Sequence, residues 1–420
     1  VCTQYIERIE KFEKDVKAWQ YFDKKKLLEK AVEADEYRKS GKPLGSLHGL
    51  PIAVKDIIGT FEMPTECGSP LRKKMPSSQD SEIVNLLKIE GAIVMGKTVT
   101  TELAYFHPGK TTNPHDNTRT PGGSSSGSAA VIAAHMAPLS IGTQTNGSVI
   151  RPASYCGVVG YKPSYGLISR SGVMRQSDKL DHIGVFGKTV EDVALFAKSL
   201  IKKDLYDPST IHYAADEMLN VCKKGPIYEP KFIFYKTKNW KNIDKESQKS
   251  FDFFIKTFSK NIEVFDTPSY FDDIPKYHKI IHETDMANNF QGYYKKSKKF
   301  LSKEMVSAIE RGLKYSAKEY AEAIDFMKRS YESYKEVFED FHGVLTPSSS
   351  GVAPKGLKST GSPEFSTIWT YMGLPSISLP LLIGANNLPL GIQLVGDKLD
   401  DLRFLGVANW LEKNCKKYAK

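Results

Sequence analysis

Cysteine is scarce in this sequence, which has five among 420 residues. The five are widely spaced, and no two of them form a C-x-x-C pair. Disulfide frameworks and zinc knuckles are built from cysteines at short, regular spacings. The sequence therefore argues against both, and so few cysteines are typical of a protein from a reducing compartment.

Long hydrophobic runs are also missing. No apolar stretch reaches the roughly 18 residues that a membrane-spanning helix needs. The N-terminus lacks the charged-then-apolar pattern of a secretory signal. We therefore expect a cytoplasmic protein that does not associate with membranes.

Positive charge is in excess, with a formal net charge of +10 and a pI of about 9.0. The lysines nevertheless alternate with Glu and Asp, as in IEKFEKDVK and KKKLLEKAVEADEYRK. Such mixtures are typical of solvated helix faces rather than of nucleic-acid-binding surfaces. We therefore expect no direct binding of nucleic acid.

Helical and strand-like patterns intermix along the chain, which predicts an α/β fold. Lys, Phe and Tyr become frequent from about residue 206 to 342, where long helical patterns dominate. Strand-like segments return afterwards, and we expect them to join the early strands, so that residues 1–420 form a single domain. Its expected parts are N-terminal helices (1–40), a core (45–200), a variable helical cap (206–342), and returning strands with a C-terminal helix (343–420).

A serine-rich loop, PGGSSSGSAAVIAAHM at residues 121–136, leads into an apolar segment that should be helical. A flexible linker would not run directly into an apolar helix. A phosphate-binding loop needs Lys and then Ser or Thr after its last glycine, whereas GSAA follows here. A nucleophile elbow centred on Ser125 needs a buried strand before it, and the polar NPHDNTRTPG precedes it. These three interpretations are therefore disfavoured.

Two other features belong with this loop. Lys55 lies in the apolar run LPIAVKDIIGT, which predicts a buried strand, and a second glycine-rich turn, GTQTNGS, ends at Ser148. Each feature alone has an ordinary explanation, as an edge lysine or a turn serine. A desolvated lysine, however, has a lowered pKa and can act as a neutral base, and hydroxyl groups can relay its proton to a nucleophile. Together the three features predict nucleophilic catalysis by a serine.

The order of these motifs closely resembles that of the amidase signature family. The matching stretches are GLPIAVKD, TPGGSSSGSAA, GTQTNGSVIRPASYCGVVGYKPSYG, LDHIGVFGKTVED, and GLPSISLP with LPLGIQLVG. They extend from about residue 45 to the end of the chain, with a poorly matched middle. The resemblance implies a central mixed β-sheet covered by helices on both faces. It also implies hydrolysis of linear C–N amide bonds, with release of ammonia or an amine and no metal or organic cofactor.

The resemblance also implies roles for the motif residues. Ser148 is then the nucleophile, Lys55 the base, and Ser124 the bridging serine, whose preceding peptide bond is cis in the family. The spacing of 24 residues between Ser124 and Ser148 matches the family and selects Ser124 among its neighbours. Ser125 is expected to be a supporting hydrogen-bond partner.

The turn that ends at the nucleophile is expected to form the oxyanion hole through the backbone N–H groups of Thr145, Asn146, Gly147 and Ser148. The family commonly has two glycines before the nucleophile, whereas Asn146 and Gly147 stand here. Because Asn tolerates left-handed backbone angles, we expect the turn to form. The Asn146 side chain could contact the substrate or could serve only the turn.

Arg151 is the candidate for substrate specificity, three residues after Ser148 in GSVIRPA. An arginine fork binds a carboxylate through two parallel hydrogen bonds. This form of the motif resembles malonamidase-like members of the family, in which the arginine holds the substrate carboxylate. The alternative is a structural ion pair beneath the sheet.

Three other polar residues have weaker interpretations. His278 and His282, four positions apart, could share a helix face as metal ligands, but no third ligand is evident and we expect no metal. The alternative is that the two histidines line the substrate pocket. Asp181 is interpreted as structural rather than catalytic.

We therefore expect a stand-alone amidase that acts on a small, polar, carboxylate-bearing amide, as a monomer or a homodimer. The alternative is the A subunit of a glutamyl-tRNA(Gln) amidotransferase, which cleaves glutamine within a complex that handles charged tRNA. Against this alternative, that subunit usually reads GSIRQPA, with the arginine two residues after the nucleophile.

Overall fold

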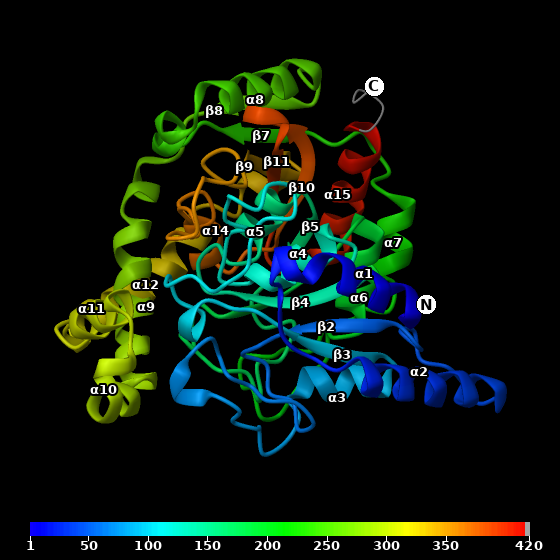
Figure 1. The fold of residues 1–420 in the computed structure, drawn as a ribbon. Helices are drawn as coiled ribbons and strands as arrows, with labels where there is room; N and C mark the ends of the chain where they lie inside the picture. Colours follow the sequence, from blue (N-terminus) through cyan, green and yellow to red (C-terminus); the bar gives the residue numbers. More distant parts are fainter. Residues whose placement is uncertain (416–420) are drawn as a thin grey trace.

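The computed structural model describes residues 1–415 and is built around one large sheet (Figure 1). The sheet has 11 strands in the order β1-β3-β2-β4-β6-β5-β10-β11-β9-β7-β8. The strands are β1 (Trp19–Phe22), β2 (Pro51–Lys55), β3 (Ile93–Thr98), β4 (Leu139–Gln144), β5 (Val159–Lys162), β6 (His182–Gly187), β7 (Phe232–Tyr235), β8 (Ile262–Phe265), β9 (Gly343–Pro347), β10 (Ser376–Ile383) and β11 (Pro389–Val395).

Helices cover the sheet and extend beyond it on one side. The α-helices are α1 (Cys2–Val16), α2 (Lys24–Lys39), α3 (Glu82–Ile89), α4 (Ser126–Ala133), α5 (Ile150–Cys156), α6 (Val190–Lys198), α7 (Met218–Lys224), α8 (Lys245–Thr257), α9 (Ile274–Asn289), α10 (Gln291–Ser297), α11 (Lys303–Gly312), α12 (Ala317–Glu332), α13 (Val337–Asp340), α14 (Thr367–Tyr371) and α15 (Asp401–Cys415). Among the described residues, none of these helices has the length and apolar character needed to cross a membrane.

The sheet is mixed, which confirms the expected fold class. Strand β2 runs parallel to β3 and β4, whereas β4 and β5 are antiparallel to β6. The expectation that late strands join early ones is also confirmed, because β10 pairs with β5 and carries β11 and β9 with it.

Two apolar layers enclose the central strands. On one face, the Ala-rich helix α4 packs with α1 and α5 against inward residues such as Ala53 and Phe186. On the other, α3, α6, α7 and α15 pack against Ile52, Val54 and Val185. Successive residues of a strand point to opposite faces, so the β2 sequence Ile52-Ala53-Val54 serves both layers. Burial on both faces explains why this strand is a continuous apolar run.

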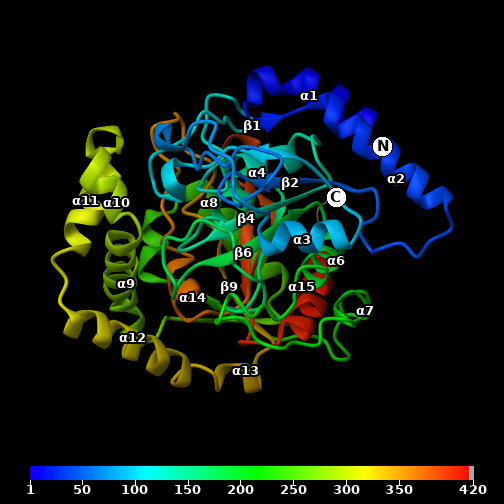
Figure 2. The same cartoon turned by 90° about the horizontal axis from the view of Figure 1, so that it is seen from below.

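The span from 206 to 342 contains more than helices. Its short apolar segments FIFY and IEVF form β7 and β8, which run parallel to each other and extend the sheet beyond β9. Helices α9, α10 and α11 stand at one side of the molecule, opposite α2 and α3 (Figure 2). The N-terminal region differs in the same way, because β1 separates its two helices and pairs with β3.

The contact between α9 and α11 depends on a glycine. An added Cβ at Gly312 would lie 1.9 Å from the backbone oxygen of Glu283, whereas a Cβ at Gly292 in α10 would meet nothing within 4 Å. We expect Gly312→Ala to lower the free energy of unfolding by about 1–3 kcal/mol through overpacking. Gly292→Ala is the matched control, because it adds a methyl group in open space on a helix and should be neutral or slightly stabilising. Urea unfolding of both variants measures this difference, and equal midpoints would refute the expected overpacking.

Candidate active site

The residues of the predicted site converge from three segments of the chain. Lys55 is the last residue of β2, Ser124 and Ser125 precede α4, and Ser148 lies in the turn between β4 and α5. Because β2 and β4 are parallel neighbours, their carboxyl ends lie together at one edge of the sheet. The order of elements therefore places the lysine next to both serine-containing loops.

Lys55 is fully buried and is surrounded by hydroxyl groups. Its Nζ lies 2.7 Å from Ser124 Oγ, 3.1 Å from Ser125 Oγ and 2.7 Å from Thr143 Oγ1. Burial, which disfavours the ammonium form, lowers the pKa of Lys55 well below its usual value, and the negative charge of Asp181 opposes this shift only in part. A neutral amine has two N–H donors and one lone pair. One of the three hydroxyls can therefore donate its proton to Nζ.

The peptide bond between Gly123 and Ser124 is cis. The backbone on either side of it is held at three successive carbonyl groups. Ser126 Oγ donates to the carbonyl of Gly122 (2.8 Å), Arg151 Nη2 donates to that of Gly123 (2.7 Å), and the N–H of Thr101 donates to that of Ser124 (3.3 Å). These contacts hold the backbone from which the Ser124 side chain extends.

The turn that carries Ser148 is braced from both ends. Gln144 Oε1 accepts hydrogen bonds from the N–H groups of Val149 (2.8 Å) and Ile150 (3.1 Å), where α5 begins. Thr370 Oγ1 accepts from Gln144 Nε2 (2.9 Å) and donates to the Asn146 carbonyl (2.5 Å). The backbone N–H groups of Asn146, Gly147 and Ser148 have no hydrogen-bond partner within residues 1–415. They therefore remain available to an anion at this turn.

Asn146 does not need left-handed backbone angles here, because its φ is not positive. Its side-chain oxygen accepts a hydrogen bond from Thr367 Oγ1 (2.8 Å), and the residue also lines the cleft beside Ser148. Gly147 is required by space, since an added Cβ would lie 2.9 Å from Pro363 Cβ. Asn146 thus contributes a side-chain hydrogen bond, whereas Gly147 allows the turn to pack closely against Pro363.

Arg151 is buried and lacks a counter-charge. Its Nη2 donates to two neutral oxygens, the Gly123 carbonyl and Thr360 Oγ1 (3.2 Å), while Nε and Nη1 are buried without a partner. Burial lowers the pKa of this guanidinium. Within the described residues there is thus no structural ion pair at Arg151. Two of its buried donor atoms are unsatisfied, and the residue lines the same cleft as Ser148.

The two histidines of α9 reach the site from outside the sheet. His278 Nε2 donates to the carbonyl of Thr145 (2.9 Å), and His282 Nε2 donates to Gln176 Oε1 (2.9 Å). His282 lines the cleft with Ser148, and no group of three or more potential metal-ligating side chains occurs in residues 1–415. The metal-ligand interpretation of this pair therefore has no support in the structure.

Asp181 supports the nucleophile turn. It accepts a hydrogen bond from Thr145 Oγ1 (2.6 Å) and others from the backbone N–H groups of Gln176 (2.8 Å) and Ser177 (3.1 Å). Burial raises the pKa of this carboxyl group. These contacts agree with its interpretation as a structural residue.

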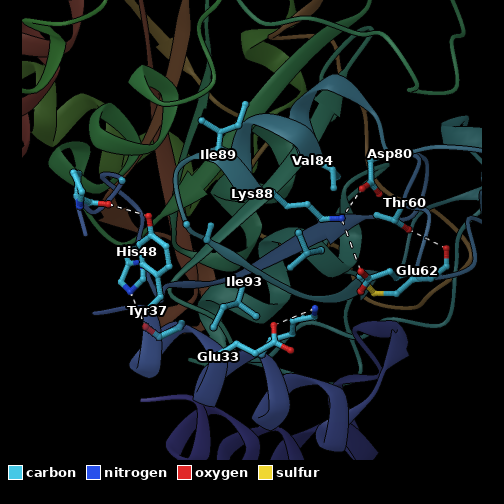
Figure 3. Close-up of a pocket in the computed structure, with 18 residues that line it drawn as sticks. Glu33, Tyr37, His48, Thr60, Glu62, Asp80, Val84, Lys88, Ile89 and Ile93 are labelled. Atoms are coloured by element: carbon cyan, nitrogen blue, oxygen red, sulfur yellow. Dashed lines mark hydrogen bonds and ion pairs between the residues drawn. The ribbon is translucent and has the colours of Figure 1, made fainter. Parts of the chain in front are cut away.

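A second cavity, of about 470 Å³, lies away from these residues between α2, α3 and β3 (Figure 3). Its wall includes Tyr37, His48 and Ile93, and Lys88 crosses it to reach Asp80 (2.5 Å). None of the predicted catalytic residues lines this cavity.

Comparisons with known proteins place the chain in a family. The family model described as Amidase matches residues 1–405. The chain belongs to the amidase family. It is accordingly an enzyme that hydrolyses C–N amide bonds.

Two curated relatives and one solved structure resemble this chain over nearly its whole length. The A subunit of the glutamyl-tRNA(Gln) amidotransferase of Alkaliphilus metalliredigens is 32% identical over 457 aligned positions, which cover 98% of this chain and 92% of the relative. The protein of the same name from Fusobacterium nucleatum is also 32% identical, with the same coverage. The crystal structure of the corresponding protein from Thermotoga maritima superimposes with a TM-score of 0.82 at 27% identity, over 99% of this chain and 91% of the other.

These relatives correct the expectation about partners. We expected a stand-alone chain that acts on a small amide, as a monomer or a homodimer. That expectation is wrong, because the curated relatives are named as one subunit of a larger enzyme that acts on a charged tRNA. They favour the alternative function over the stand-alone amidase. The position of Arg151, one residue later than usual, was too weak an argument against it.

The family signature did not reveal Thr143, the third hydroxyl on Lys55. The available signal was the position of Thr143 in the turn motif GTQTNGS that ends at Ser148. Thr367 and Thr370, which brace the turn, come from α14 at the other end of the chain. No local pattern in the sequence connects them with the motif.

We expect the pH dependence of kcat/KM to report the lowered pKa of Lys55. Activity should rise with pH as the free enzyme loses this proton, because only the neutral amine accepts one. Lys55→Met should lower kcat/KM by about 10²–10⁴-fold and remove this rising limb. Thermal unfolding of the variant is the control for folding, and near-normal activity of a folded Lys55→Met enzyme would exclude Lys55 as the base.

Proposed function

We propose that Ser148, Ser124 and Lys55 form the catalytic triad. Neutral Lys55 takes a proton from Ser124 Oγ, which takes one from Ser148 Oγ as that oxygen bonds to the amide carbonyl carbon. The N–H groups of Thr145, Asn146, Gly147 and Ser148 hold the resulting oxyanion, where one donor typically contributes about 3 kcal/mol. Ser125 supports the lysine. The short contacts between Lys55 Nζ and the Ser124 and Thr143 hydroxyls support this assignment.

The remaining steps return the proton and release the products. The tetrahedral intermediate collapses, the C–N bond breaks, and the proton held by Lys55 passes through Ser124 to the leaving nitrogen, which departs as ammonia. Water then attacks the acyl group on Ser148, with Lys55 again receiving the proton through the same serine. The acid product leaves and Ser148 regains its hydroxyl.

We further propose that the substrate is glutamine and that the chain is the A subunit of a glutamyl-tRNA(Gln) amidotransferase. The observation that carries the substrate class is the buried Arg151 guanidinium, with Nε and Nη1 unpaired one helical turn after Ser148. A substrate carboxylate bound to Arg151 would accept hydrogen bonds from Nε and Nη1 and would supply the counter-charge that the guanidinium lacks. Glutamine has this carboxylate together with the side-chain amide.

The same proposal includes the organisation and location of the chain. We propose that all 420 residues act as one domain, since strands from both halves contribute to one sheet. We also propose a cytoplasmic location, where charged tRNA would be available to the enzyme. The five cysteines, all free and buried, are compatible with a reducing compartment.

Membership of the amidotransferase complex is tested by adding the companion subunits of a glutamyl-tRNA(Gln) amidotransferase to the purified chain. We expect ammonia release from glutamine and the formation of glutaminyl-tRNA, both abolished by Ser148→Ala. Ser350→Ala is a control that changes a serine outside the proposed triad. If the wild-type chain releases ammonia but never supports amidation of the tRNA, the proposal that it belongs to the complex is refuted. The proposed amide hydrolysis would be retained.

Arg151 makes a separate prediction about substrate charge. A hydrogen bond to a charged group contributes about 1.5–3 kcal/mol, so Arg151→Met should lower kcat/KM for glutamine about 10- to 100-fold relative to a neutral amide such as butyramide. The readout is the ratio of the two substrates, because Arg151 also holds the Gly123 carbonyl and its loss should slow both reactions. An unchanged ratio would mean that Arg151 serves only the loop.

A further inference from the structure

His282 lines the cleft beside Ser148, and its hydrogen bonding determines which of its two ring nitrogens carries the hydrogen. Gln176 Nε2 donates to the carbonyl of Leu103 (2.6 Å), so Gln176 Oε1 faces His282 as an acceptor. His282 Nε2 must therefore carry the hydrogen. In the neutral ring, Nδ1 is then a lone-pair acceptor.

This acceptor has no partner in the protein. Among the described residues, His282 Nδ1 makes no hydrogen bond, and it is not among the buried unpaired atoms. The ring lines the cleft together with Ser148 and Arg151. Nδ1 is therefore an accessible acceptor on a residue that lines this cleft, whereas the unpaired Nε and Nη1 of Arg151 are buried in the cleft wall.

The surroundings keep the ring neutral and oriented. Burial lowers the pKa of His282 well below its usual value, and the neighbouring His278 lowers it further. Tyr105 packs edge-on against the ring, with the centroids 5.6 Å apart. A neutral imidazole held in this way accepts a hydrogen bond at Nδ1 and does not repel a cation.

We propose that His282 Nδ1 accepts a hydrogen bond from the α-ammonium group of the substrate, while Arg151 binds its α-carboxylate. The inference rests on the proposed function and makes it more specific, since it selects an α-amino acid amide over a simple carboxylate-bearing amide. Arg151 supplies hydrogen-bond donors and His282 an acceptor at one cleft, which matches the negative carboxylate and the positive ammonium group of a zwitterion. The selectivity would thus come from α9, outside the signature motifs.

Two amide substitutions separate this role from a structural one. In His282→Asn the side-chain oxygen can occupy the place of Nδ1, which keeps an acceptor in the cleft and loses the bond to Gln176. In His282→Gln the side-chain amide can reach the place of Nε2, which keeps the bond to Gln176 and removes the acceptor. Lys279→Ala, at an exposed position of the same helix, is the control for α9.

Binding is measured by calorimetry on the full chain in a Ser148→Ala background, so that no turnover occurs. The two ligands are glutamine and glutaramate, the same amide without the amino group. We expect the parent and Lys279→Ala to prefer glutamine, His282→Asn to retain most of this preference, and His282→Gln to reduce it about 10- to 100-fold. Binding of glutaramate should change little in either His282 variant.

Three results would overturn the inference. These are equal binding of the two ligands by the parent, a preference that survives in His282→Gln, and a preference lost in His282→Asn but kept in His282→Gln. The last result would assign His282 to holding Gln176. Failure of the proposed function is read separately, as an absence of tRNA amidation despite selective binding of glutamine.

Discussion

The burial of one lysine organises this active site. Lys55 ends a strand that is covered on both faces, so its side chain has no route to solvent and must find partners inside the protein. Removal of an ammonium group from water is costly, and the hydroxyls of Ser124, Ser125 and Thr143 form hydrogen bonds without supplying a counter-charge. The environment therefore favours the neutral amine. In the proposed mechanism, the same hydroxyls that make burial tolerable also provide the path by which a proton reaches the amine.

The rest of the fold keeps this arrangement in place. The hydrogen bond from Arg151 to the Gly123 carbonyl connects the loop that contains the cis peptide bond with the helix that follows the turn at Ser148. Helix α14 holds the turn from one side, and His278 of α9 holds the Thr145 carbonyl from another. Interactions from three parts of the chain thus preorganise the donors for an oxyanion, which is where electrostatic catalysis gains most.

The segments that meet at Lys55 could be identified from the sequence because their signal is local. Lys55 is recognisable as a charged residue in an apolar strand, and the two glycine-rich loops are recognisable from their composition and their order along the chain. Strands β7 and β8 were not predicted, because four-residue apolar segments between long helical patterns have no distinctive period. Thr370 could not be found either, since its contact with Gln144 joins residues 226 positions apart. That the curated relatives are subunits of a larger enzyme is a relationship between proteins, which neither charge nor composition expresses.

The pairing of β10 with β5 has a consequence for how the enzyme is made. Strand β5 pairs with β6, and both follow the turn at Ser148 in the first half of the chain, whereas β10 and α14 come some two hundred residues after β5. Contacts so distant in sequence are slow to form, because loop closure must precede them. During synthesis the Lys55 segment and both serine loops leave the ribosome well before the brace on Asn146 exists. The hydrogen bond from Thr370 that holds the turn at Asn146 can therefore form only near the end of translation.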